Sequence, residues 1–158
     1  IKLSAPNKLL ELEIHENPVF YFNKSDSLKP SRLDKNNFLE KLRTRIEMLK
    51  VRFDLFNNLV EKEINRGNVL EALEWYRVFT LASLIEVLRM KHYPFHYNFR
   101  MRYIHYELPQ EIVRELENLH FIKDMEDLEK KYAKATKWFI REISTINFKE
   151  IERKIAET

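Results

Sequence analysis

Apolar residues recur at every third or fourth position through a long stretch in the first half of the chain. This spacing puts them on one face of an α-helix and predicts a helix over residues 34–66. Gly67 is expected to end it in the left-handed conformation. Asn68, with Glu71 three residues later, predicts a second helix that starts with an asparagine form of the capping box. The recurring residues are Leu39, Leu42, Ile46, Leu49, Phe53, Phe56 and Val60.

The second helix, expected over residues 69–91, carries apolar residues on nearly every side. Such a helix is typical of the centre of a bundle. The short connection at Gly67 predicts that it packs antiparallel against the first helix. Pro109, Asp124 and Asn147 predict the starts of a third, a fourth and a short fifth helix.

The first 33 residues follow a different pattern. Apolar and polar residues alternate over residues 10–14, which predicts a strand, and a turn separates it from a second β-prone run over residues 19–22. We therefore expect a strand-containing segment over residues 1–33 and a helical bundle over residues 34–158. The predicted fold class is mainly α: a four- to five-helix up-down bundle preceded by a short β-hairpin-like element.

The composition excludes several classes of site. Gly67 is the only glycine, so loops that bring the backbone close to a phosphate, such as Walker and dinucleotide-binding loops, are absent. The lack of cysteine excludes disulfides, thiolate metal sites and a cysteine nucleophile. No apolar run reaches the roughly 18 residues of a membrane span. We expect a cytoplasmic protein with no membrane partner.

The net charge is only +3, but one segment differs from the rest. Residues 87–106 contain no Asp or Glu, while they hold six aromatic residues and three of the five histidines. Pro94 interrupts the second helix, so residues 96–106 are expected to form a loop.

This acid-free segment is the strongest candidate for a binding function. Guanidinium groups suit phosphate or carboxylate, and the interleaved rings offer stacking faces. The alternative is that the rings cap the end of the bundle and the arginines pair with acidic residues elsewhere. The candidate substrate-binding residues here are His96, Tyr97, Arg100, Arg102, Tyr103 and His105.

Glu74 and Arg77 lie three positions apart on the second helix and therefore on one face. They could form a partly buried ion pair that fixes the register of the bundle, or they could face a cleft and bind substrate. We keep both as candidate substrate-binding residues. His92 and His96 are separated by Pro94 and lack an HExxH motif, so no metal site is predicted in this chain.

Together these residues resemble a known family. The run Leu73-Glu74-Trp75-Tyr76-Arg77, the basic and aromatic stretch over residues 89–105, and Glu107-Leu108-Pro109 before an acidic helix are similar to the C-terminal helical domain of small bacterial and archaeal nucleotidyltransferases. That group includes relatives of the aminoglycoside nucleotidyltransferases, and the resemblance covers residues 34–146. It implies a bundle that forms one wall of the cleft and holds a small-molecule acceptor or nucleotide.

In that family a separate polymerase-β-like domain holds Mg²⁺ and a nucleoside triphosphate with a Gly-Ser turn and an Asp-x-Asp pair. This chain has neither motif, so we expect it to need a nucleotidyltransferase catalytic domain and not to catalyse transfer alone. Its opening residues resemble the end of such a domain, where a carboxylate would stand at Glu11 or Glu13. Glu13 is the favoured catalytic candidate; the alternative is an ordinary exposed glutamate on an edge strand.

Two other functions stay open. HEPN domains are similar helical bundles, and some are ribonucleases with an Arg-x4-His motif, a spacing that Arg100 and His105 match. In that case the histidine would move a proton, the arginine would hold the phosphate, and RNA would be the partner. The third possibility is a helical interaction module with no enzymatic activity.

Overall fold

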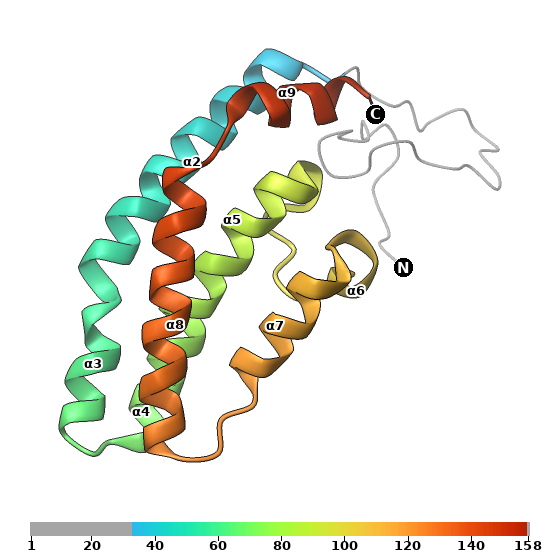
Figure 1. Cartoon of the computed structure of the whole chain (residues 1–158). Coiled ribbons are helices and arrows are strands. Elements are labelled where there is room, and N and C mark those ends of the chain that lie inside the picture. The colour runs from blue at the N-terminus through green and yellow to red at the C-terminus, as the bar shows by residue number, and fades with distance from the viewer. Residues whose placement is uncertain (1–32, 158) are drawn as a thin grey trace, which may run out of the picture.

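The described part of the chain is mainly helical (Figure 1). A computed structural model describes residues 33–157, and no strand occurs among them, so the prediction of a mainly α fold is confirmed. The β-hairpin-like element expected within residues 1–33, and Glu13 with it, lies outside the described residues. In chain order the elements are α2 (Lys35–Phe56), α3 (Asn58–Asn65), α4 (Val69–Trp75), the π-helix η1 (Tyr76–Leu81), α5 (Ala82–His92), the 3₁₀ turn η2 (Pro94–His96), α6 (Ile104–Glu107), α7 (Gln110–His120), α8 (Met125–Ser144) and α9 (Phe148–Ala156).

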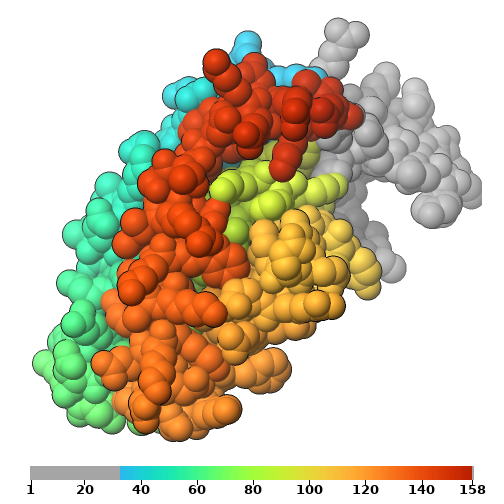
Figure 2. All heavy atoms as spheres, viewed as in Figure 1, coloured from blue at the N-terminus to red at the C-terminus, as the bar shows by residue number. Residues whose placement is uncertain are grey.

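The long helices run alternately up and down. α2 and α3 descend along one side, α4 to α5 return, α7 descends and α8 ascends (Figure 1). α9 lies across one end of the bundle, beside the start of α2 (Figure 2). Side-chain contacts show the antiparallel register directly, because Arg45 bonds Glu86 while Arg52, seven residues later, bonds Val78, eight residues earlier. The expected packing of the first two helical segments is therefore confirmed.

The predicted apolar seam, which runs along α2 and into α3, forms one wall of the core. Its members are buried except Phe56, which is 41% exposed and stacks on Phe79 at 5.0 Å. Phe53 stacks on Phe139 of α8 at a ring-centroid distance of 3.9 Å. α5 is buried almost throughout, as expected for a central helix, whereas Leu70 in α4 is 79% exposed. The prediction that residues 69–91 are enclosed on every side therefore holds only for the second half of that segment.

The first helix is broken at Asn57, where one continuous helix was expected. Asn57 is buried, and its side chain donates to Tyr132 and Thr136 of α8 and accepts from Thr80 at 2.6 Å. Its main-chain oxygen also accepts from the Tyr132 hydroxyl at 3.1 Å. The break lies at the point where this residue bonds side chains of η1 and α8.

The turn between α3 and α4 was predicted in part. Gly67 adopts a left-handed φ of +73°, as expected for a helix C-terminus. The capping box is wrong, because the Asn68 side chain makes no hydrogen bond to the first turn of α4. Its Nδ2 instead donates to Glu63 Oε2 at 2.7 Å, which ties the turn back to α3.

Other local predictions agree with the structure. Asp124 caps α8 by accepting from the Asp127 N–H at 2.8 Å, and Asn147 caps α9 by accepting from the Lys149 N–H at 3.0 Å. The segment expected as a loop contains the short elements η2 and α6. Within residues 33–157 no helix combines the length and apolar character that crossing a membrane requires.

Candidate functional site

A cleft of about 560 Å³ lies between α2, the η1–α5 segment and the turn that follows η2. Four arginines and one histidine line it against two glutamates, and its remaining lining is largely apolar. We call it the arginine cleft. Its lining residues are Arg45, Arg52, Glu74, Arg77, Val78, Leu81, Ala82, Ile85, Glu86, Tyr97, Asn98, Arg100, Met101 and His120.

The two arginines from α2 are committed to the protein. Arg45 makes a bidentate pair with Glu86, through Nε to Oε1 at 2.5 Å and Nη2 to Oε2 at 2.9 Å. Its hydrogen bond to Glu86 raises the pKa of Arg45 above its ordinary value, although burial acts in the opposite direction. Arg52 donates to the Val78 main-chain oxygen at 3.1 Å, and its guanidinium lies 5.4 Å from the Phe79 ring. These arginines hold α2 against η1 and α5.

The π-helix shapes the opposite wall. In η1 the Ala82 N–H bonds the oxygen of Arg77, five residues back, instead of the usual four. A π-helix carries an extra residue per turn, and such insertions are frequent at functional sites. Here the segment supplies Arg77 and Val78 to the cleft.

Glu74 and Arg77 do not form the ion pair considered above. Both are exposed, and neither makes an ion pair or a side-chain hydrogen bond with any residue that the structure describes. Both line the arginine cleft. Of the two interpretations, the structure favours the one in which these residues face a cleft.

A buried arginine organises the acid-free segment. Arg89 is completely enclosed, and its Nε donates to the Arg100 main-chain oxygen at 2.7 Å. It also donates to the Arg102 main-chain oxygen and to Glu107 Oε2. The other oxygen of Glu107 lies 2.6 Å from His96 Nδ1. Arg89 therefore fastens the whole turn over residues 97–107, which we call the basic turn.

Two residues of the basic turn have a left-handed backbone. Arg100 has φ +53° and Tyr103 has φ +60°. Residues with a Cβ rarely adopt the left-handed backbone conformation, which costs about 1–2 kcal/mol for each residue. Strained residues of this kind are frequent at functional sites. The bonds from Arg89 hold the backbone in this shape, and the result is that the Arg100 side chain reaches the arginine cleft. Arg100 has no ion pair within the described residues.

The structure separates the predicted site residues into groups. Glu74, Arg77, Tyr97 and Arg100 meet in the arginine cleft. His96 has a structural position, since it bonds Glu107 and stacks on Phe99 at 3.9 Å. The other predicted residues, Arg102, Tyr103 and His105, are exposed on the basic turn and do not line the cleft.

The pair considered for ribonuclease chemistry is divided. Arg100 lines the cleft, whereas His105 is exposed and lies 4.0 Å from Glu117 Oε1. Arg100 lies in a turn that precedes α6, so no single helix presents both residues.

Three basic residues of the cleft were not predicted from the sequence: Arg45, Arg52 and His120. Arg45 and Arg52 are seven residues apart, which places them on one face of α2 beside the apolar seam, and this spacing could have suggested them. His120 gave no such signal, because it lies at the end of α7 and reaches the cleft only through the fold. Its Nδ1 lies 2.6 Å from the Leu116 main-chain oxygen. Because a carbonyl oxygen only accepts, Nδ1 carries the hydrogen in this contact, and in the neutral imidazole Nε2 is then a hydrogen-bond acceptor.

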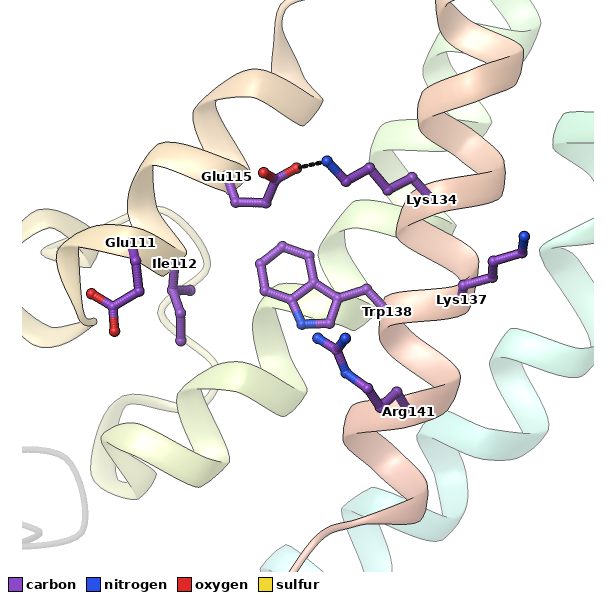
Figure 3. Close-up of a pocket in the computed structure, with 7 residues that line it drawn as sticks. All are labelled: Glu111, Ile112, Glu115, Lys134, Lys137, Trp138 and Arg141. Atoms are coloured by element: carbon purple, nitrogen blue, oxygen red, sulfur yellow. Dashed lines mark ion pairs between the residues drawn. The ribbon is translucent and has the colours of Figure 1, made fainter.

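A second hollow of about 520 Å³ lies between α7 and α8, with the Trp138 indole at its centre (Figure 3). Lys134 spans it to Glu115 at 2.6 Å. The Trp138 Nε1 and the Arg141 guanidinium both donate to Glu142 at 3.0–3.2 Å. Its central charged groups thus bind one another, so the arginine cleft is the better candidate for an anionic ligand.

An apolar face of α2 adjoins the arginine cleft. Met48, Val51 and Leu55 are each more than half exposed there, and Arg52 lines both this face and the cleft. Within residues 33–157 no group of three or more His, Cys, Asp or Glu side chains is arranged to hold a metal ion.

Comparison of the chain with models of known protein families, with curated proteins and with solved structures gave no match.

Proposed function

We propose that this helical bundle is the acceptor-binding part of a nucleotidyltransferase and that the arginine cleft holds the acceptor. The observation that carries the proposal is the position of Arg100. A buried guanidinium holds its backbone in a strained conformation, and its own guanidinium lines a cleft without an ion pair among the described residues. This arrangement contributes nothing evident to folding and suits the binding of an anion.

The cleft offers three kinds of contact to a ligand. Arg77 and Arg100 supply guanidinium groups from two different elements. Leu81 and Ile85 lie on the apolar side of the cleft, and the Nε2 of His120 can accept a hydrogen bond from a hydroxyl or amine. The combination suits a small molecule with an anionic group, an apolar or planar body and a hydrogen-bond donor.

The role of the bundle in the reaction would be orientation. Nucleotidyl transfer requires the acceptor to attack in line, so holding it in a fixed pose lowers the entropic part of the barrier. Mg²⁺ and the nucleoside triphosphate would be bound by a separate catalytic domain, since the Gly-Ser turn and Asp-x-Asp pair are absent from this sequence. The apolar face of α2, beside the cleft, is the surface against which we place that domain.

Titration calorimetry with AMP tests the cleft. The probe carries a phosphate, a planar base and hydroxyl donors. We expect Arg77→Ala and Arg100→Ala each to weaken AMP binding about tenfold, the 1.4 kcal/mol of one charge-assisted contact. Arg114→Ala is the matched control, because it removes an exposed arginine of α7 that does not line the cleft. Equal loss in all three variants, or no loss in any, contradicts the proposal.

The coding sequence before Ile1 tests the enzymatic part. A Gly-Ser turn followed by an Asp-x-Asp pair in the same polypeptide supports a nucleotidyltransferase. A start codon directly before Ile1, with no nucleotidyltransferase domain encoded beside it, contradicts it.

A further inference from the structure

The basic turn presents aromatic and basic side chains together to solvent. Tyr106 is 88% exposed and Tyr103 50% exposed, and Arg102 and His105 are exposed beside them. We propose that this turn binds single-stranded nucleic acid and that the terminal nucleotide of the strand enters the arginine cleft at Arg100. The acceptor would then be the end of a nucleic-acid chain, and this last step rests on the proposed function of the cleft.

The stability of the fold does not explain why these tyrosine rings are exposed. Burying a tyrosine side chain stabilises a protein by about 2 kcal/mol or more, and Tyr106 contributes almost none of this at 88% exposure. An exposed ring beside a cation is instead the unit with which proteins bind single strands, because each base stacks on a ring while the phosphates meet basic groups.

The rings and cations of the turn form a connected set. The Arg102 guanidinium lies 5.2 Å from the Phe99 ring and 5.3 Å from the Tyr103 ring. Phe99 also stacks on His96, whose ring continues the row inward. The Arg102 guanidinium thus lies beside two aromatic rings on an exposed side chain, where a base or a phosphate can reach it.

The local charge favours a polyanion. No acidic residue occurs between residues 87 and 106, and the next one, Glu107, is paired with the buried Arg89. Among the exposed groups of the turn, His105 lies 4.0 Å from an acidic side chain, Glu117 of α7. The positive potential of Arg100 and Arg102 is therefore not cancelled within the turn itself.

The turn is also held in one shape before any ligand binds. Arg89 bonds the backbone at two positions of the turn, and left-handed residues lie at Arg100 and Tyr103. A fixed backbone lowers the entropy that binding must remove. Arg100 and Met101 line the cleft while Arg102 to Tyr106 follow directly in sequence, so one strand can continue from the outer rings into the cleft.

Fluorescence anisotropy with a labelled decauridylate tests this inference. Tyr106→Ala removes one stacking platform, worth about 1–3 kcal/mol per base, so we expect binding to weaken at least fivefold. Arg102→Ala is expected to weaken binding because it removes one phosphate contact. The plot of the logarithm of the binding constant against the logarithm of the salt concentration should therefore become less steep by about 0.7. The matched controls are Leu70→Ala, which removes an exposed apolar side chain, and Lys62→Ala, which removes an exposed charge far from the turn. Both should bind as the parent protein does.

The outcomes separate the two proposals. If Tyr106→Ala loses affinity for decauridylate but binds AMP normally, the surface is confirmed, and weaker AMP binding in Arg77→Ala confirms the cleft independently. If decauridylate does not bind, or if Tyr106→Ala binds it as the parent does, the proposal that the basic turn binds nucleic acid is wrong. This conclusion does not depend on the result of the AMP titration. A decathymidylate arm assigns the strand to RNA or DNA. Equal binding of poly-glutamate and decauridylate, unaffected by Tyr106→Ala, shows simple charge attraction and overturns the inference.

Discussion

The buried guanidinium of Arg89 donates from Nε to the main-chain oxygen of Arg100 at 2.7 Å, so one arginine of the acid-free segment fixes the backbone of another. Similar residues in one stretch of sequence thus have opposite roles. Arg89 is enclosed and bonded within the protein, while Arg100 is exposed and lines the cleft.

Arg89→Met should strongly destabilise the fold. The substitution keeps much of the apolar stem but leaves the Glu107 carboxylate with less compensation in a buried site, and breaking such a pair costs about 3–5 kcal/mol. Arg89→Lys keeps the charge but loses the fork that reaches two main-chain oxygens, so an intermediate loss is expected. Urea unfolding measures both. Arg100→Ala, at an exposed position, should change stability by less than about 1 kcal/mol, and a comparably small effect of Arg89→Met would contradict the role assigned to it.

Asn57→Ala should lower the free energy of unfolding by about 1–3 kcal/mol. The change removes the amide that bonds Tyr132, Thr136 and Thr80, and leaves the buried Thr80 hydroxyl without that acceptor. Asn58→Ala is the control, because its side chain is exposed at the adjacent position and should change stability by no more than about 0.5 kcal/mol. Equal effects at the two positions would show that the network does not stabilise the break.

Gly67→Ala should destabilise the protein through the backbone alone. A Cβ at this position would meet no atom within 4 Å, so no clash contributes. The cost is that of a φ of +73° for a residue with a Cβ, about 1 kcal/mol. Gly67→Asn should cost less, because asparagine tolerates the left-handed region better. Thermal unfolding of the two variants checks the order, and a more stable alanine variant would contradict it.

Glu142 should make stability depend on pH in the acid range. Burial by itself would raise the pKa of this carboxyl, but hydrogen bonds from Lys91, Arg141 and Trp138 bring the pKa below its ordinary value. A lowered pKa in the folded state means that the ionised carboxylate stabilises the fold above the unfolded pKa of about 4.3. This contribution is lost as the pH falls through the folded pKa.

Glu142→Gln tests this sign. The variant should be less stable than the parent near neutral pH, and the difference should shrink as the pH falls below about 4. Urea unfolding at several pH values gives the comparison, with Glu129→Gln, at an exposed position of the same helix, as the control. A difference that is constant across the acid range would show that the carboxylate charge is not responsible.

The sequence by itself determined the helical content and most helix ends. The apolar spacing in α2, the caps at Asp124 and Asn147, and the left-handed Gly67 are local properties, which a few neighbouring residues decide. It also identified the acid-free segment and four of the residues that line the arginine cleft.

Only the tertiary structure decided which of these groups remain available to a ligand. The break at Asn57 depends on Thr80 and Tyr132, residues 23 and 75 positions away. Arg45 and His120 join one cleft from helices far apart in the chain. An arginine can be buried only where the fold provides acceptors for its guanidinium. For Arg89 these acceptors are Glu107 and two main-chain oxygens. Such pairings depend on long-range packing, and the spacing of residues along one chain does not encode them.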